Sequence, residues 1–145
     1  MTDFAPLLLR LEAAPDAAGL SAVGREVLAS LAKARAALDP SDAAIAASVF
    51  DLARAAMAAI DPSGTTAAPG YQQAWSLLAV ARGQVDLLVH AQDPALARAA
   101  VQMVLVLDEV ILFMPEPAAL APVAFDPAVI AEAVTRIEGL VAGQI

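Results

Sequence analysis

The chain has 145 residues, no cysteine and a net charge of −8, since 16 acidic residues oppose 8 basic ones. Although 60% of the residues are hydrophobic, 38 of the 145 are alanine, the strongest helix former, so the composition indicates helices and excludes intrinsic disorder, collagen and a disulfide scaffold. Because the sequence has no basic cluster, we expect neither a nucleic acid nor an anionic membrane surface as a partner.

Apolar residues spaced three and four positions apart predict helices in the first part of the chain. The first predicted helix covers residues 2–14 and ends at Pro15. A second covers residues 21–38, and a third covers residues 40–60. Residues 61–70 contain two prolines and two glycines, so this segment is predicted to be a loop.

Three further helices are predicted after this loop. They cover residues 71–91, 94–114 and 127–142. Residues 115–126 are rich in proline and are predicted to form a second long loop between the last two helices.

Four Asp-Pro dipeptides divide the sequence. An aspartate side chain accepts hydrogen bonds from the first free amides of a helix, and proline fits the first helical turn because its missing N–H would have no partner there. Asp61-Pro62 is predicted to open a loop, whereas the other three precede periodic apolar segments and are predicted to start helices. These three are Asp39-Pro40, Asp93-Pro94 and Asp126-Pro127.

No segment alternates apolar and polar residues over a sustained length, so the predicted fold class is all-α. We expect residues 1–145 to form a single domain. Its predicted architecture is an up-down bundle of five to six helices joined by short loops, with helix starts marked by Asp-Pro.

Residues with catalytic or metal-binding chemistry are few. The sequence lacks the glycine-rich, Walker, zinc-protease and serine-hydrolase motifs, so we predict no catalytic residue, no metal and no cofactor. His90 is the single histidine, which excludes a helical di-iron site. Asp108 and Glu109 diverge by about 100° on a helix, so we do not expect them to bind one metal ion.

The first residues lack the basic and apolar regions of a signal peptide. The longest apolar stretch, Val101–Met114, includes charged residues and is shorter than the roughly 20 residues that a membrane-spanning helix needs. We therefore expect a cytoplasmic protein that does not cross a membrane.

A charged stripe with two aromatic residues runs along the predicted helix of residues 71–91. Arg82 and Asp86 are four positions apart and are expected to form an ion pair. On a helical wheel Trp75 lies beside them, and Tyr71 lies one turn earlier on the same side. An aromatic residue at the margin of a charged stripe is typical of an interface, so these four residues are candidate partner-binding residues. Alternatively, Trp75 packs under one of the two loops.

The predicted helix of residues 94–114 is apolar nearly all round. Val101, Leu105 and Leu112 lie opposite its main apolar face and are also candidate partner-binding residues. Either this helix is the central helix of the bundle, or its second face contacts another chain.

The leading functional hypothesis is a non-catalytic interaction protein, such as an adaptor, a chaperone or a regulatory subunit, that binds a protein partner or forms a homo-oligomer. The alternative is a small-molecule-binding or enzymatic helical domain with a pocket between helices near Trp75, Arg82 and Asp86. A third possibility is one subunit of an obligate hetero-complex.

Overall fold

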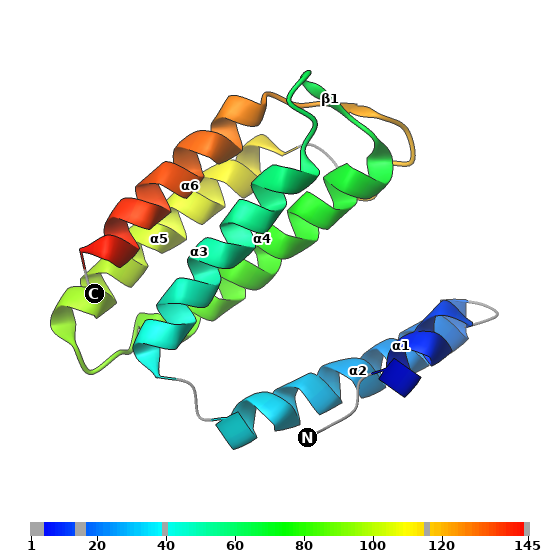
Figure 1. The fold of residues 1–145 in the computed structure, drawn as a ribbon, viewed down its shortest axis with the longest axis horizontal. Coiled ribbons are helices and arrows are strands. Elements are labelled where there is room, and N and C mark those ends of the chain that lie inside the picture. Colours follow the sequence, from blue (N-terminus) through cyan, green and yellow to red (C-terminus); the bar gives the residue numbers. More distant parts are fainter. Residues whose placement is uncertain (1–4, 14–16, 39–40, 115–116, 144–145) are drawn as a thin grey trace. The chain divides into compact units, whose positions relative to one another are not determined.

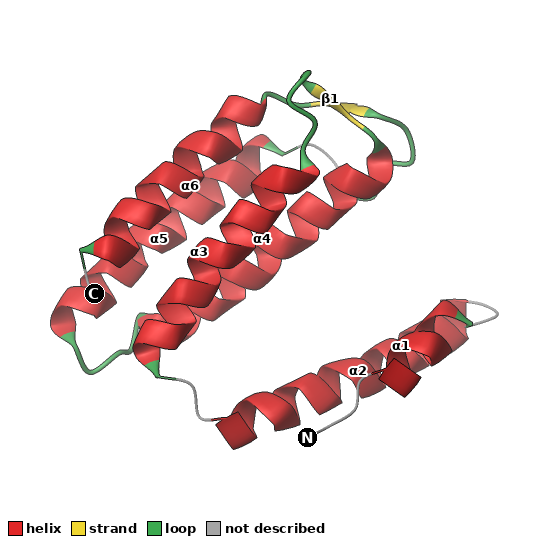
Figure 2. Cartoon of the chain, in the orientation of Figure 1, coloured by secondary structure: helices red, strands yellow, loops and turns green. Residues whose placement is uncertain are grey.

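The computed structural model describes residues 5–13, 17–38, 41–114 and 117–143. These residues are mostly helical, which confirms the predicted all-α class (Figure 2). The chain divides into two compact units, Met1–Pro40 and Ser41–Ile145, and each is described by itself.

The first unit contains α1 (Ala5–Glu12) and α2 (Ala17–Leu38), which pack against each other. Arg10 of α1 donates two hydrogen bonds to the carboxylate of Glu26 of α2, with N–O distances of 2.7 and 3.1 Å. This contact raises the pKa of Arg10 and lowers the pKa of Glu26. Both side chains are exposed, so the ion pair is expected to add little stability.

The second unit contains α3 (Asp42–Ala59), α4 (Ala68–Leu88), α5 (Pro94–Phe113) and α6 (Pro127–Ala142). Helix α3 packs against α4 and α6, and α5 packs against the same two helices. Helices α3 and α5 therefore lie diagonally opposite each other. Successive helices run in opposite directions (Figure 1). We call this part of the chain the four-helix unit.

Side-chain caps begin three helices of this unit. Asp93 accepts a hydrogen bond from the amide of Ala95 at 2.8 Å, and Asp126 accepts one from Ala128 at 2.9 Å, in each case with proline in the first turn. The cap of α3 is Ser41, which accepts from the amide of Ala44. The dipeptide Asp39-Pro40 lies outside the described residues.

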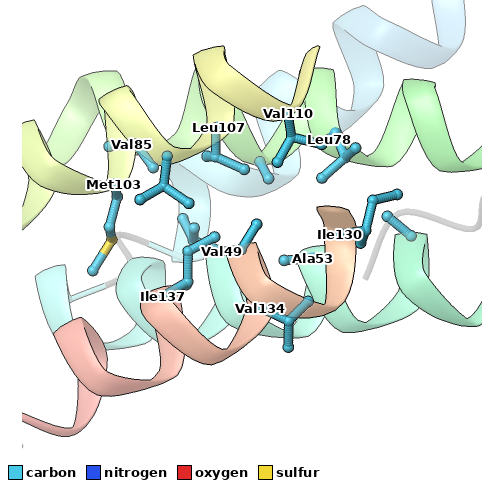
Figure 3. Packing of buried hydrophobic residues seen from close by; sticks show 14 of the residues in the cluster. Val49, Ala53, Leu78, Val85, Met103, Leu107, Val110, Ile130, Val134 and Ile137 are labelled. Carbon is cyan, nitrogen blue, oxygen red and sulfur yellow. The ribbon is translucent and has the colours of Figure 1, made fainter. Parts of the chain in front are cut away.

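The core of the four-helix unit is built by inward-facing apolar residues from all four helices (Figure 3). The helical spacing of these buried residues is clearest on α4, where successive buried positions are alternately three and four residues apart. They are Tyr71, Ala74, Leu78, Ala81, Val85 and Leu88. The two alanines on this face leave room for neighbouring helices to approach closely, and the larger residues fill the space between them.

The two long loops meet at one end of the four-helix unit. Strand β1 (Thr65–Thr66) pairs antiparallel with β2 (Val123–Ala124), and the amide of Phe125 donates to the carbonyl of Gly64 at 3.0 Å. The amide of Asp61 donates to the hydroxyl of buried Thr66 at 2.9 Å. Gly64 has a positive φ of 87°, which L side chains rarely adopt. Two-residue strands are too short for a periodicity signal, so the sequence predicted only loops here.

Across the described ranges, none of the helices is both long and apolar enough to cross a membrane.

Candidate interaction surface

Four large apolar side chains of α5 are exposed. Phe113 lines a groove beside α6, and the other three point away from the core of the four-helix unit. Val101 is 45% exposed, Leu105 is 55% exposed and Leu112 is 82% exposed. The opposite side of the same helix is buried along its whole length, including Leu96, Met103 and Leu107. Within the four-helix unit, α5 is thus one of four corner helices and is not enclosed on all sides. We call Val101, Leu105 and Leu112 the α5 face.

Tyr71 lies in the core, so its predicted place on an exposed stripe with Trp75 is corrected. Its side chain is 0% exposed and its ring meets Phe125 edge to face, with centroids 6.2 Å apart. Burial raises the pKa of its hydroxyl. The helical wheel placed the apolar face of this segment without counting Ala74, which is fully buried. Trp75 is half-buried and packs against the edge of the core.

Arg82 connects α4 to α5. It forms the ion pair with Asp86 that the sequence predicted, and its Nε also donates to Oδ1 of Asp108 on α5 at 2.7 Å. These two hydrogen bonds, led by the one to Asp108, raise the pKa of Arg82. The contact with Asp108 could not be predicted from residue spacing, since only the packing of the two helices brings together residues that are 26 positions apart.

A second ion pair connects α5 to α6. Arg136 of α6 donates to Glu109 of α5 at 2.9 Å. Ion pairs therefore connect α5 to both of its neighbouring helices. One joins Asp108 to Arg82 of α4, and the other joins Glu109 to Arg136 of α6. The α5 face is thus an apolar surface with charged residues along its edges, the composition of an interface core and rim.

Replacing Arg82 with glutamine is expected to lower the free energy of unfolding by at most about 1 kcal/mol, because both of its carboxylate partners are exposed. Urea denaturation followed by circular dichroism measures this change. In a double-mutant cycle, Asp108→Asn should add little to Arg82→Gln. A loss well above 2 kcal/mol would contradict a peripheral role for this ion pair.

A groove with a volume of about 130 Å³ lies between α5 and α6. Its walls include Val106, Phe113 and Arg136. Pockets for drug-sized ligands usually measure about 300–1,000 Å³, so this groove suits a single side chain better than a metabolite. Trp75, Arg82 and Asp86, the residues of the predicted pocket, do not line it.

The negative charge is concentrated in the four-helix unit. Residues 41–145 contain 11 acidic and 4 basic residues, a net charge of −7 out of the total of −8. The charged residues beside the α5 face include Arg82 and Arg136, each of which is paired with a carboxylate of α5, and Glu132, which lines the groove next to Glu109 and Arg136. Within the described ranges, no group of three or more acidic or histidine side chains is arranged to hold a metal ion.

No protein-family model, no curated protein and no solved structure matches this chain. The structure defines an all-α protein with an acidic four-helix unit and an exposed apolar face on one of its helices.

Proposed function

We propose that this chain is a non-catalytic interaction protein of the adaptor, chaperone or regulatory-subunit type, and that its α5 face binds a protein partner. The observation on which the proposal depends is the exposure of Val101, Leu105 and Leu112 on one side of a helix whose other side is fully buried. Contiguous exposed apolar residues with charged neighbours are typical of protein interaction sites.

The energetics support docking at this face. Burying a fully exposed valine or leucine side chain stabilises a complex by about 1.5–3 kcal/mol, and Val101 and Leu105, which are about half exposed, contribute a corresponding fraction. The charged groups at the edges, Asp108 and Glu109, are already held by Arg82 and Arg136. Docking against this face therefore buries apolar surface without requiring the partner to neutralise these two carboxylates.

Thiol labelling tests whether a partner covers the α5 face. Because the chain has no cysteine, a single introduced thiol is the only one that can react. The substitution Leu105→Cys places a thiol in the α5 face, and Leu120→Cys places a reference thiol at a loop position that is 94% exposed. The rate of reaction with a small maleimide is measured for each variant and divided by its rate in denaturant. The measurement is made on the purified chain over a range of concentrations, and in an extract of cells that naturally produce the protein.

We expect the thiol at position 105 to react about tenfold more slowly than the reference in at least one of these two settings. The reason is that a partner at ten times its dissociation constant leaves about one tenth of the chains unbound. Equal rates at both positions in every setting would overturn the proposal. Protection that persists in a dilute monomer would also overturn it, because the face would then be covered within one chain.

A further inference from the structure

The groove between α5 and α6 is the first of three hollows that follow one another along these two helices. On α5 the row of hollows extends from Phe113 to Ala95, which spans about 27 Å of helix. Neighbouring hollows share lining residues, which are Val106 and Arg136 for the first two and Gln102 and Leu140 for the last two. We call this row of hollows the α5–α6 trough.

The trough lies directly beside the α5 face. Leu105 is four residues before Glu109, so the two side chains are about 40° apart around the axis of α5. Glu109 and Phe113 line the trough, and Phe113 is 62% exposed. A partner that covers the α5 face therefore also reaches the trough.

We propose that the partner segment covering the α5 face is a basic amphipathic helix, which lays apolar side chains into the trough and directs a lysine or arginine to Glu132. This inference rests on the proposed function and specifies the chemistry of its partner. Docking of the apolar side of a helix in a groove is one of the recurring modes of peptide recognition.

The walls of the trough favour a helix over an extended segment. Both walls are helices whose backbone groups bond within the helix, so they offer no free sheet edge to which an extended peptide could add a strand. A helix forms its own backbone hydrogen bonds and needs mainly apolar contacts from the trough. Val106, Val110 and Phe113 provide such contacts in the first hollow.

The charges favour a basic partner. The four-helix unit has a net charge of −7, so it attracts a basic segment and repels an acidic one, including a second copy of itself. In the first hollow, Arg136 is paired with Glu109, whereas Glu132 is exposed and makes no ion pair with any residue in the described ranges. Arg98 lines the third hollow, so the cation of the partner is expected at the Glu132 end.

Two synthetic peptides test this chemistry, each of about 18 residues to match the length of the trough. Both have leucine along one helical face, and the positions beside that face are lysine in one peptide and glutamate in the other. Fluorescence anisotropy of the labelled peptides measures binding to the full chain. We expect the lysine peptide to bind at least about 30-fold more tightly than the glutamate peptide. The lysine peptide should also protect the thiol of the Leu105→Cys variant from maleimide, but not that of Leu120→Cys.

Two pairs of matched variants locate the bound peptide. Glu132→Gln should weaken binding of the lysine peptide about fivefold, whereas Glu138→Gln, the same change on α6 outside the trough, should weaken it less than about twofold. Gly139 lines the second hollow, and a Cβ atom there would meet nothing within 4 Å, so Gly139→Leu fills the trough without a clash at the backbone. It should weaken binding at least about tenfold. Gly83→Leu on α4, where a Cβ atom also meets nothing within 4 Å, should leave binding unchanged. Circular dichroism should show that both glycine variants are folded, because leucine favours a helix over glycine.

Four results would contradict the inference. They are absence of binding by the lysine peptide, equal binding of the two peptides, equal effects of Glu132→Gln and Glu138→Gln, and full binding to the Gly139→Leu variant. Protection of the thiol at position 105 in the concentrated purified chain alone would indicate a second copy as the partner, and would contradict it as well. The proposed function fails separately, when that thiol reacts as fast as the reference in every setting. It still holds if the thiol is protected in the cell extract while the lysine peptide does not bind.

Discussion

Replacing Tyr71 with alanine is expected to lower the free energy of unfolding by about 3–5 kcal/mol, the range measured when a fully buried large aromatic side chain is removed. Tyr71 is completely buried, and its ring packs edge to face against Phe125. The neighbouring core is formed by rigid helices, so it can fill the resulting cavity only in part. Urea denaturation monitored by circular dichroism measures the loss.

Two variants control for this result. Tyr71→Phe retains the ring and its contact with Phe125, so it should cost only about 0.5–1.5 kcal/mol for the hydroxyl. Trp75→Ala removes a half-buried side chain at the edge of the core and should cost less than Tyr71→Ala. If Tyr71→Ala kept full stability and lost only partner binding, the placement of this residue in the core would be wrong.

Gly70→Ala is expected to lower the free energy of unfolding by about 1–3 kcal/mol. A Cβ atom at this position would lie 2.7 Å from the carbonyl oxygen of Ala59 at the end of α3, closer than real Cβ contacts allow. The obstacle is backbone, so it cannot move aside as a flexible side chain can. The start of α4 would have to shift away from the end of α3, which loosens the packing of these two helices at this point.

Gly83→Ala is the matched control for this prediction, because it makes the same chemical change on the same helix. A Cβ atom at position 83 would meet nothing within 4 Å. Since alanine favours a helix over glycine by about 0.8–1 kcal/mol, Gly83→Ala should stabilise the protein. Opposite signs for the two variants in parallel urea titrations are the expected outcome. A neutral or stabilising effect of Gly70→Ala would show that α3 and α4 are not held this closely.

The helices themselves were predictable because their apolar periodicity is local. The helix predicted for residues 127–142 matches α6 in both bounds, and the one predicted for residues 94–114 extends one residue beyond α5. The start of α4 was less accurate. Pro69 and Gly70 were assigned to a loop, whereas α4 begins at Ala68 with the proline in its first turn. Proline allows both structures, so its presence alone could not decide between them.

The candidate site was predictable only in part, because a helical wheel shows which residues share a face but not which face is buried. The apolar second side of residues 94–114 is visible on a helical wheel, and the exposed Val101, Leu105 and Leu112 were found in this way. The burial of Tyr71 was not predicted, because Ala74, one turn away on the same buried face, has only a small apolar side chain and gives a weak signal on a hydrophobicity wheel. Small residues mark a core face as well as large ones when helices pack closely, but composition alone does not show which alanines are buried.

The sequence by itself determined the all-α class, the approximate bounds of the helices and the apolar second side of α5, since each depends on residues a few positions apart. Only the tertiary structure decided that α5 occupies a corner of the four-helix unit, that Tyr71 is in the core and that Arg82 joins Asp108. These features depend on which helices become neighbours and how each is rotated about its axis. That choice follows from the fit of many side chains at once, and no short segment of the sequence contains it.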